Sequence, residues 1–326
     1  MTNDFGKGHH LHLIDGSGFI FRAYHALPPL TRKSDGLPIG AVSGFCNMLY
    51  KFVEDQKGID APTHVAVIFD AKGKTFRSDI YPDYKANRPP APEDLVPQFP
   101  LTRDATRAFN LSCIEQAGLE ADDIIATLAT QARDRGGRVT IISSDKDLMQ
   151  LVGNGVDMLD AMKNKRIDSD GVFEKFGVKP DRVIDVQSLA GDSVDNVPGA
   201  PGIGVKTAAL LINEYGDLES LLERASEIKQ PKRKDTLINF ADQIRISRDL
   251  VTLKVDADIE VSLEDLEVKE PDSTELLKFL NEMEFRTLTN RIAAKLGVDA
   301  PVNEQKIAQG SEGSSINTNI MSFNSV

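Results

Sequence analysis

Acidic residues recur in this chain at positions where a parallel sheet would bring them together. Three segments with the pattern of buried strands end in aspartate, at Asp15, Asp70 and Asp145, and Asp147 follows the last of them. Ligands of parallel α/β sheets bind beyond the carboxyl ends of the strands. These side chains are therefore expected at one edge of the sheet.

More acids lie at the start of a helix expected over residues 121–135. The stretch "GLEADDII" places Glu120, Asp122 and Asp123 at the same edge, because this helix leads into the strand before Asp145. Acids in a first helical turn are favoured by ~0.3–1 kcal/mol each. That would explain one or two of them, and whether it explains all three depends on which other acids come near.

A last pair, Asp192 and Asp195, lies in "GDSVDN", on one face if this turn is helical. For a single acid, a turn or cap role is the commoner one. Gathering all of them uncompensated would cost more than the ~5–15 kcal/mol that keeps a domain folded. If they converge, cations must be present, and the expected ligands are Asp15, Asp70, Glu120, Asp122, Asp123, Asp145, Asp147, Asp192 and Asp195.

The chemistry of this set favours particular ions. Oxygen ligands without His or Cys nearby favour Mg²⁺ or Mn²⁺ over zinc. A carboxylate cage around hydrated Mg²⁺ is the usual apparatus for in-line phosphodiester hydrolysis with two metal ions. The acids thus predict a two-metal phosphodiesterase site.

A glycine-rich turn, "VPGAPGIGVKTA", precedes a helix expected over residues 205–215. Backbone amides of such a turn bind phosphate, with Gly202 and Gly204 shaping the turn and Lys206 adding a charge. No strand precedes it, which excludes a dinucleotide fold, and the Walker spacing is absent. The alternatives are a helix-hairpin-helix that grips a DNA backbone and a plain Pro/Gly turn.

Residues 72–100 are rich in Lys, Arg, Tyr and Pro and too long for an ordinary connection, so we expect a lid or arch. Arg77, Lys85 and Arg88 could follow phosphates, and Tyr84 could offer its ring to an unpaired base. The alternative is a solvated loop whose tyrosines only pack.

The surrounding pattern predicts an α/β domain with a mainly parallel sheet. Strands are expected at residues 11–15, 65–70, 138–145 and 156–160, with helices at 41–53 and 121–135 between them. From about residue 180 the strand signals stop and helical segments follow. After about residue 295 the chain turns polar and is expected to be a flexible tail.

Composition sets further limits. The chain has 326 residues, enough for two domains, and a net charge of −12, which argues against a nucleic-acid partner unless the acids gather in one site. No apolar run reaches a membrane span, and we see no export signal. Two separated cysteines indicate a reducing compartment, so a cytoplasmic location is expected.

Ordered motifs identify a resemblance. "LIDGSGFIFRAYHA", "VIFDAKGKTFR", "YKANRPP", "LEADDIIATLA", "SSDKDLMQLV" and "GDSVDNVPGAPGIGVKTA" resemble the 5′-nuclease (5′→3′ exonuclease) domains of bacterial DNA polymerase I, of the flap endonuclease family. The resemblance implies a PIN-like, Rossmann-like nuclease core over 1–179 with a helical arch at about 72–100. It also implies a helical DNA-binding domain over 180–295, which contains a helix-hairpin-helix at 197–216. A flexible tail follows at 296–326.

The resemblance also implies roles. All nine acids match metal-site positions, two ions being expected. Tyr84, Lys85 and Arg88 match catalytic positions, and Arg22 and Arg77 match positions that face the scissile phosphate or the threaded 5′ strand. The turn with Gly202, Gly204 and Lys206 matches the duplex-binding turn, where K⁺ is usual.

The function expected is Mg²⁺-dependent cleavage of DNA at 5′ flaps, nicks and gaps, with RNA-primed strands also possible substrates. Asp15, Asp70, Glu120, Asp122 and Asp145 are expected to hold one metal, and Asp147, Asp192 and Asp195 the second or its waters. A monomer without membrane partners is expected, either standing alone or tethered to a polymerase domain.

Three other functions are compatible with parts of the sequence. A catalytically idle DNA-junction binder would gain by losing negative charge near phosphate, so the full set of acids argues against it. A small-molecule phosphatase has no use for the arch or the hairpin turn. A PIN-type ribonuclease is the nearest alternative.

Overall fold

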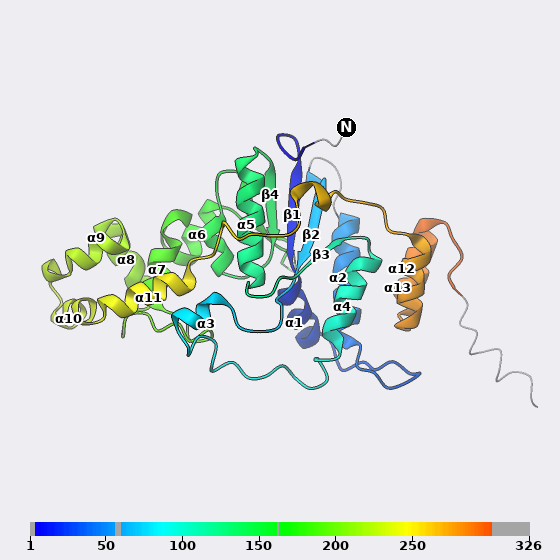
Figure 1. The fold of residues 1–326 in the computed structure, drawn as a ribbon, viewed down its shortest axis with the longest axis horizontal. Helices are drawn as coiled ribbons and strands as arrows, with labels where there is room; N and C mark the ends of the chain where they lie inside the picture. Colours follow the sequence, from blue (N-terminus) through cyan, green and yellow to red (C-terminus); the bar gives the residue numbers. More distant parts are fainter. Residues whose placement is uncertain (1–3, 56–59, 162, 302–326) are drawn as a thin grey trace, which may run out of the picture. The chain divides into compact units, whose positions relative to one another are not determined.

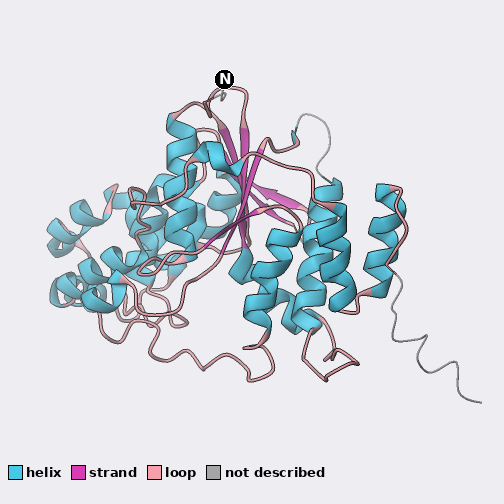
Figure 2. Ribbon diagram, turned by 45° about the vertical axis from the view of Figure 1, so that its right-hand side comes forward, coloured by secondary structure: helices cyan, strands magenta, loops and turns pink. Residues whose placement is uncertain are grey.

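The structure is a computed structural model that describes residues 4–55, 60–161 and 163–301, so most of the predicted tail lies outside it. Within these ranges six strands form one sheet (Figures 1 and 2). The strands are β1 (His10–Asp15), β2 (His64–Ile68), β3 (Ser112–Ile114), β4 (Arg138–Ile142), β5 (Val156–Asp160) and β6 (Lys165–Ile167). All pairs are parallel except β5 with β6, which confirms the mainly parallel sheet.

The strand order β3-β2-β1-β4-β5-β6 places a switch point at the centre of the sheet. From β1 the chain builds outwards through β2 and β3, then returns to pair β4 with the other side of β1. Connections therefore leave β1 and β4 in opposite directions, which opens a crevice at their carboxyl ends. Asp15 and Asp145 come from these two strand ends.

The two sheet faces are covered by different helices. Leu11 and Leu13 belong to the same core cluster as the apolar residues of α5 (Ala121–Asp134). Side chains alternate across a strand, and His12 accordingly packs on the other face, its ring 5.5 Å from that of Phe52. Figure 1 shows α5 on one side and, on the other, α1 (Gly16–Ala26), α2 (Gly40–Asp55) and α4 (Gln98–Ala108).

Helices follow the sheet, as the loss of strand patterning predicts. They are α6 (Ser169–Phe176), α7 (Val183–Ala190), α8 (Val205–Tyr215), α9 (Leu218–Glu223), α10 (Pro231–Asn239) and α11 (Ala241–Val251). The helix α7 packs against α8 and α11, and buried residues of this region continue the core cluster of the sheet. The first compact unit ends at Asp272; in the second, α12 (Ser273–Glu282) and α13 (Arg286–Leu296) pack together.

The segment 72–100 is only partly helical. It contains α3 (Phe76–Ile80), then turns and extended chain until α4 begins at Gln98. Proline lacks an amide donor and disfavours helix in the residue before it, which explains the irregular stretch. The prolines concerned are Pro82, Pro89, Pro90, Pro92 and Pro97.

In the part of the chain that the structure describes, no helix is both long and apolar enough to cross a bilayer.

Candidate active site

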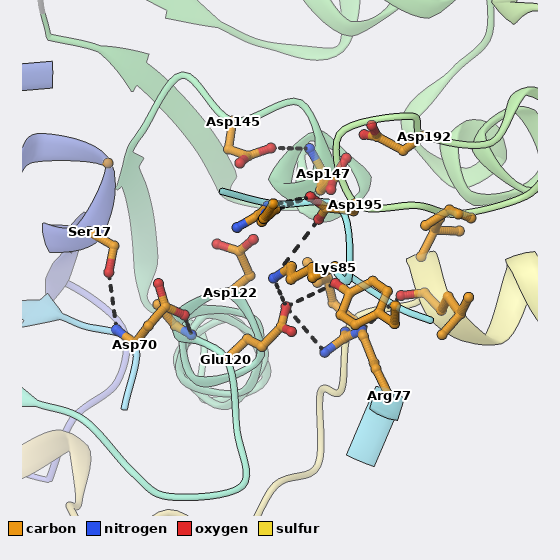
Figure 3. Close-up of a pocket in the computed structure, with 18 of the residues that line it drawn as sticks. Ser17, Asp70, Arg77, Lys85, Glu120, Asp122, Asp145, Asp147, Asp192 and Asp195 are labelled. Carbon is orange, nitrogen blue, oxygen red and sulfur yellow. Dashed lines mark hydrogen bonds and ion pairs between the residues drawn. The ribbon is translucent and has the colours of Figure 1, made fainter. Parts of the chain in front are cut away.

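A pocket of about 180 Å³ opens at the carboxyl edge of the sheet, at the switch point (Figure 3). Eight of the nine predicted acids line it: Asp15, Asp70, Glu120, Asp122, Asp145, Asp147, Asp192 and Asp195. They come from the carboxyl ends of three strands, β1, β2 and β4, from the start of α5 and from the loop after α7. The pocket therefore depends on the whole first unit being folded.

Asp15 ends β1 and caps α1. One carboxylate oxygen accepts from the Gly18 amide at 2.7 Å and the other from the Ser143 hydroxyl at 2.8 Å. A Cβ at position 18 would lie 2.4 Å from the carboxylate, so glycine is needed there. Burial raises the pKa of Asp15 to about 6 despite these bonds, and the charges of neighbouring acids add to the effect.

Asp70 and Asp122 meet where β2 and α5 approach each other. The carboxylate of Asp70 accepts from the Ala121 amide at 2.9 Å, and its own amide donates to Ser17. Burial, followed by the charges of Asp145 and Asp15, raises the pKa of Asp122 well above its usual value. These acids therefore generate a negative potential that the protein leaves uncompensated.

Asp145 and Asp147 lie in the connection after β4. The Asp147 amide donates to the Asp145 carboxylate at 2.9 Å, and Gln187 in α7 donates to Asp147. Burial, and then the charge of Asp145, raises the pKa of Asp147 to about 7. Two adjoining carboxylates here resist simultaneous ionisation.

Asp192 and Asp195 reach the pocket from a loop, residues 192–197, which we call the acidic loop. This turn is not helical, so helical spacing does not bring the two acids together; Asp192 and Val197 form an antiparallel bridge instead. Behind it, Gly191 and Gly199 touch backbone to backbone: a Cβ on Gly191 would lie 2.6 Å from the Val197 carbonyl oxygen. The bridged backbone of this loop, and not helical spacing, places both acids in the pocket.

Basic side chains from residues 83–88, the basic turn, close one side of the pocket. The Lys85 Nζ lies 2.8 Å from Glu120 Oε2 and 3.9 Å from Asp195, and Arg88 pairs with Asp195. Figure 3 shows Lys85 reaching between these two carboxylates. The Tyr84 hydroxyl donates to Glu120 at 3.2 Å, and burial and the Glu120 charge raise its pKa, so it stays a proton donor.

Asp123 departs from its predicted role, and Arg77, which lines the pocket, is held by buried partners. Asp123 is 0% exposed and lies outside the pocket, where both its oxygens accept from Arg77, at 2.7 and 2.8 Å. Arg77 is 1% exposed and also donates to the carbonyls of Leu250 and Thr252. The pair joins α3, α5 and the end of α11, so Asp123 is not free for a metal, and Arg77 also lies 3.6 Å from the pocket carboxylate of Glu120.

The remaining predicted DNA contacts lie in two places. Arg22 in α1 donates to Ser144 at 2.8 Å and pairs with Asp160, in a small recess that Asp15 also lines. Gly202, Gly204 and Lys206 lie outside the pocket in an exposed turn at the start of α8, with Gly202 at φ +78° and Gly204 as the N-cap.

Polar partners of the acids that were not predicted from the sequence include Ser143, Lys146 and Gln187. Lys146 pairs with Asp192 at 2.5 Å; although burial opposes the charge, this bond lowers the pKa of Asp192. Its place between two predicted ligands in "DKD" was a usable signal. Ser143 and Gln187 have no such signal in the sequence, because their hydrogen-bond partners come from distant segments.

The donor set fits divalent ions bound partly through water. Among residues 4–55, 60–161 and 163–301, no group of three or more His, Cys, Asp or Glu side chains has a geometry that would hold an ion directly. Mg²⁺ commonly keeps several waters and uses one or two carboxylates, and all donors here are oxygen. The raised pKa values of Asp15, Asp122 and Asp147 show the unbalanced charge that cations would relieve.

Family models match most of the chain. Residues 10–177 match the N-terminal resolvase-like domain of 5′-3′ exonuclease, and residues 178–274 match its C-terminal SAM fold. Among curated relatives, the 5′-3′ exonuclease of Aquifex aeolicus is 38% identical over 86% of this chain and 94% of its own length. DNA polymerase I of Rhizobium leguminosarum is 59% identical over 93% of this chain, which spans 30% of that protein.

Solved structures share the fold. The T5 5′-exonuclease with bound zinc superposes with a TM-score of 0.62 at 22% identity, over 75% of this chain and 90% of that one. A T5 flap endonuclease complex with DNA and metal ions gives 0.62 at 21% identity, over 84% and 99%. The fold, the acidic pocket and these matches define an α/β nuclease with a resolvase-like core. The chain belongs to the 5′-3′ exonuclease family.

Proposed function

We propose that this chain hydrolyses DNA phosphodiester bonds at 5′ flaps and nicks, in a reaction that requires divalent metal ions. The observation that carries the proposal is the pocket, where eight carboxylates face basic side chains of a single turn. The bound DNA of the T5 flap endonuclease complex, on the same fold, supports it. A binding module would have no use for so much negative charge beside phosphates.

Labelled 5′-flap DNA tests the proposal directly. Incubation with Mg²⁺ or Mn²⁺ should release the flap strand, and EDTA should stop the release while leaving DNA bound. Matched flaps with an RNA 5′ segment distinguish a deoxyribonuclease from a ribonuclease of the same fold. Stable binding without cleavage in either metal would defeat the proposal.

The metal roles divide the pocket in two. Asp15, Asp70, Glu120, Asp122 and Asp145 would hold one ion, and Asp147, Asp192 and Asp195 a second one or its waters. When bound, such ions supply positive charge that polarises the phosphodiester and activates water. Asp123 has no part, since Arg77 occupies both its oxygens.

The basic turn would orient the scissile phosphate. Lys85 and Arg88 are paired with pocket carboxylates, and divalent ions on those carboxylates would free the two cations to face a phosphate. Tyr84 keeps Glu120 oriented by donating its hydroxyl proton. Arg22, 32% exposed, would contact the strand beside Asp15.

The turn at the start of α8 would hold duplex DNA. Its exposed amides precede a helix N-terminus, and Lys206 adds an exposed charge, the arrangement that binds phosphate without reading sequence. A monovalent cation such as K⁺ at Gly202–Lys206 belongs to the same proposal. Removing K⁺ should then weaken duplex binding more than cleavage of bound flaps.

A further inference from the structure

Two asparagines join the basic turn to the acidic loop. Asn87 Nδ2 donates to the Ser193 carbonyl at 2.7 Å, and Asn196 Nδ2 donates to the Asp83 carbonyl at 2.7 Å. The Lys85 amide completes the junction by donating to the Asp195 carbonyl at 2.9 Å. Each segment therefore offers a side-chain amide to the backbone of the other.

These bonds differ from ordinary turn chemistry. Asparagine in a turn usually bonds to backbone a few residues away. Asn87 and Asn196 instead bond across 106 and 113 positions of sequence, in opposite directions. Local turn formation does not account for either bond, whereas docking of two segments accounts for both.

The bonds also support a strained backbone. Lys85 has φ +58°, a left-handed region that a residue with a long side chain rarely adopts without support, and Asn196, a residue type that tolerates this region, has φ +57°. Beneath the junction, Tyr84 packs against Val197, Leu250 and Val251. The basic turn is thus fixed from its backbone as well as from its apolar side.

We propose that Asn87 and Asn196 are positioning residues for Lys85 and Arg88, a proposal that rests on the proposed nuclease function. They lock the basic turn onto the acidic loop, so that Lys85 and Arg88 enter the pocket from a fixed backbone. Neither asparagine lines the pocket, and both act through the cations that flank them. The same junction ties the expected second metal ligands to the basic side chains, so displacement of one segment displaces the other.

Measurements on substrate-free variants test whether the two asparagines hold the basic turn against the acidic loop. Asn87→Ala and Asn196→Gly remove the amides, and glycine keeps the positive φ at position 196. The control is Asn110→Gly, because Asn110 has φ +55°, donates to the Glu270 carbonyl at 2.7 Å and does not line the pocket. Tryptic cleavage after Lys85 and hydrogen exchange at its amide should rise roughly fivefold for each hydrogen bond removed, while the control stays at the wild-type level.

Kinetics on flap DNA test the positioning. We expect kcat to fall roughly fivefold in each variant with KM nearly unchanged, and the double variant to lose less than the product of the two. Asn87→Gln should restore part of the loss. Unchanged protection of Lys85, or lost protection with unchanged kcat, would overturn the proposal. If the wild-type protein fails to cleave, the nuclease proposal fails, while the protease and exchange measurements still decide whether the lock exists.

Discussion

Arg77 and Asp123 form a bidentate ion pair, with N–O distances of 2.7 and 2.8 Å, in which the side chains are 1% and 0% exposed. Next to Asp123 on the same helix, Asp122 points into the pocket and has no such ion pair with any residue that the structure describes. Adjacent carboxylates of one motif thus have opposite physical roles: one is fully compensated and structural, and the other is uncompensated and free to bind.

Removal of these two charges should have opposite effects on stability. Asp123→Ala removes the bidentate partner of a buried guanidinium and leaves only Glu120, at 3.6 Å, to offset its charge, which should cost about 3–5 kcal/mol of unfolding free energy. Asp122→Asn removes repulsion and should leave metal-free stability unchanged or higher. Urea unfolding in EDTA measures both, and equal destabilisation would contradict the assignment.

The pH dependence of metal-free stability should report Asp147. Its pKa rises from 3.8 to about 7 on folding, so the folded protein binds the proton more tightly than the unfolded chain. The resulting stabilisation is complete below pH 4 and is lost as the pH rises from about 4 to about 7. Each pH unit between the unfolded and folded pKa values corresponds to about 1.4 kcal/mol of unfolding free energy.

Comparison with Asp147→Asn isolates that effect from other titrating groups. In EDTA the unfolding free energies of the two proteins should agree best near pH 4. As the pH rises to 7, the unfolding free energy of the variant should increase relative to that of the wild type. Saturating Mg²⁺ at pH 7 should reverse the order, because the ion stabilises the wild type more. A pH-independent difference in EDTA would rule this out.

Asp145→Ala should abolish cleavage while flap binding stays measurable. Asp145 is exposed, so its loss leaves no cavity, and its removal takes away a carboxylate at the switch point and a neighbour of Asp147. Single-turnover cleavage with Mg²⁺, alongside DNA binding in EDTA, is the measurement. Unchanged turnover would remove Asp145 from the proposed metal site.

Lys206→Ala should weaken duplex binding without slowing cleavage of saturating substrate. Removing one lysine–phosphate interaction should lower the slope of log K against log salt by about 1. Titrations of flap DNA between low and moderate salt measure the slope. The exposed Lys232 in α10 offers a matched substitution; an equal change there would show that Lys206 has no special place.

Regular elements with long apolar patterns were predictable from the sequence. The structure confirms strands at β1, β2, β4 and β5, and places α5 and α8 over Ala121–Asp134 and Val205–Tyr215. The strands β3 and β6 were missed, because three residues are too few to show a period. A helical arch was expected over residues 72–100, but this segment is mostly turns and extended chain.

Of the site, strand-end position predicted which acids gather, but not how they are held. Successive residues on a helix point about 100° apart, so Asp122 and Asp123, in the first turn of α5, face different surroundings. The partner that captures Asp123 comes from Arg77, which no local spacing reveals. Asp192 and Asp195 lie in the pocket because a bridged loop carries them, which the spacing of the two acids did not reveal.

The close approach of Gly191 to Gly199 limits how this site can be altered. A Cβ at position 199 would lie 2.5 Å from the Gly191 nitrogen, so main chain meets main chain with no side chain between them. Elsewhere in the protein a spacing can be adjusted by exchanging larger and smaller residues. Here the main chain itself fixes the base of the acidic loop, so widening the pocket beside Asp192 would require inserting residues into the loop.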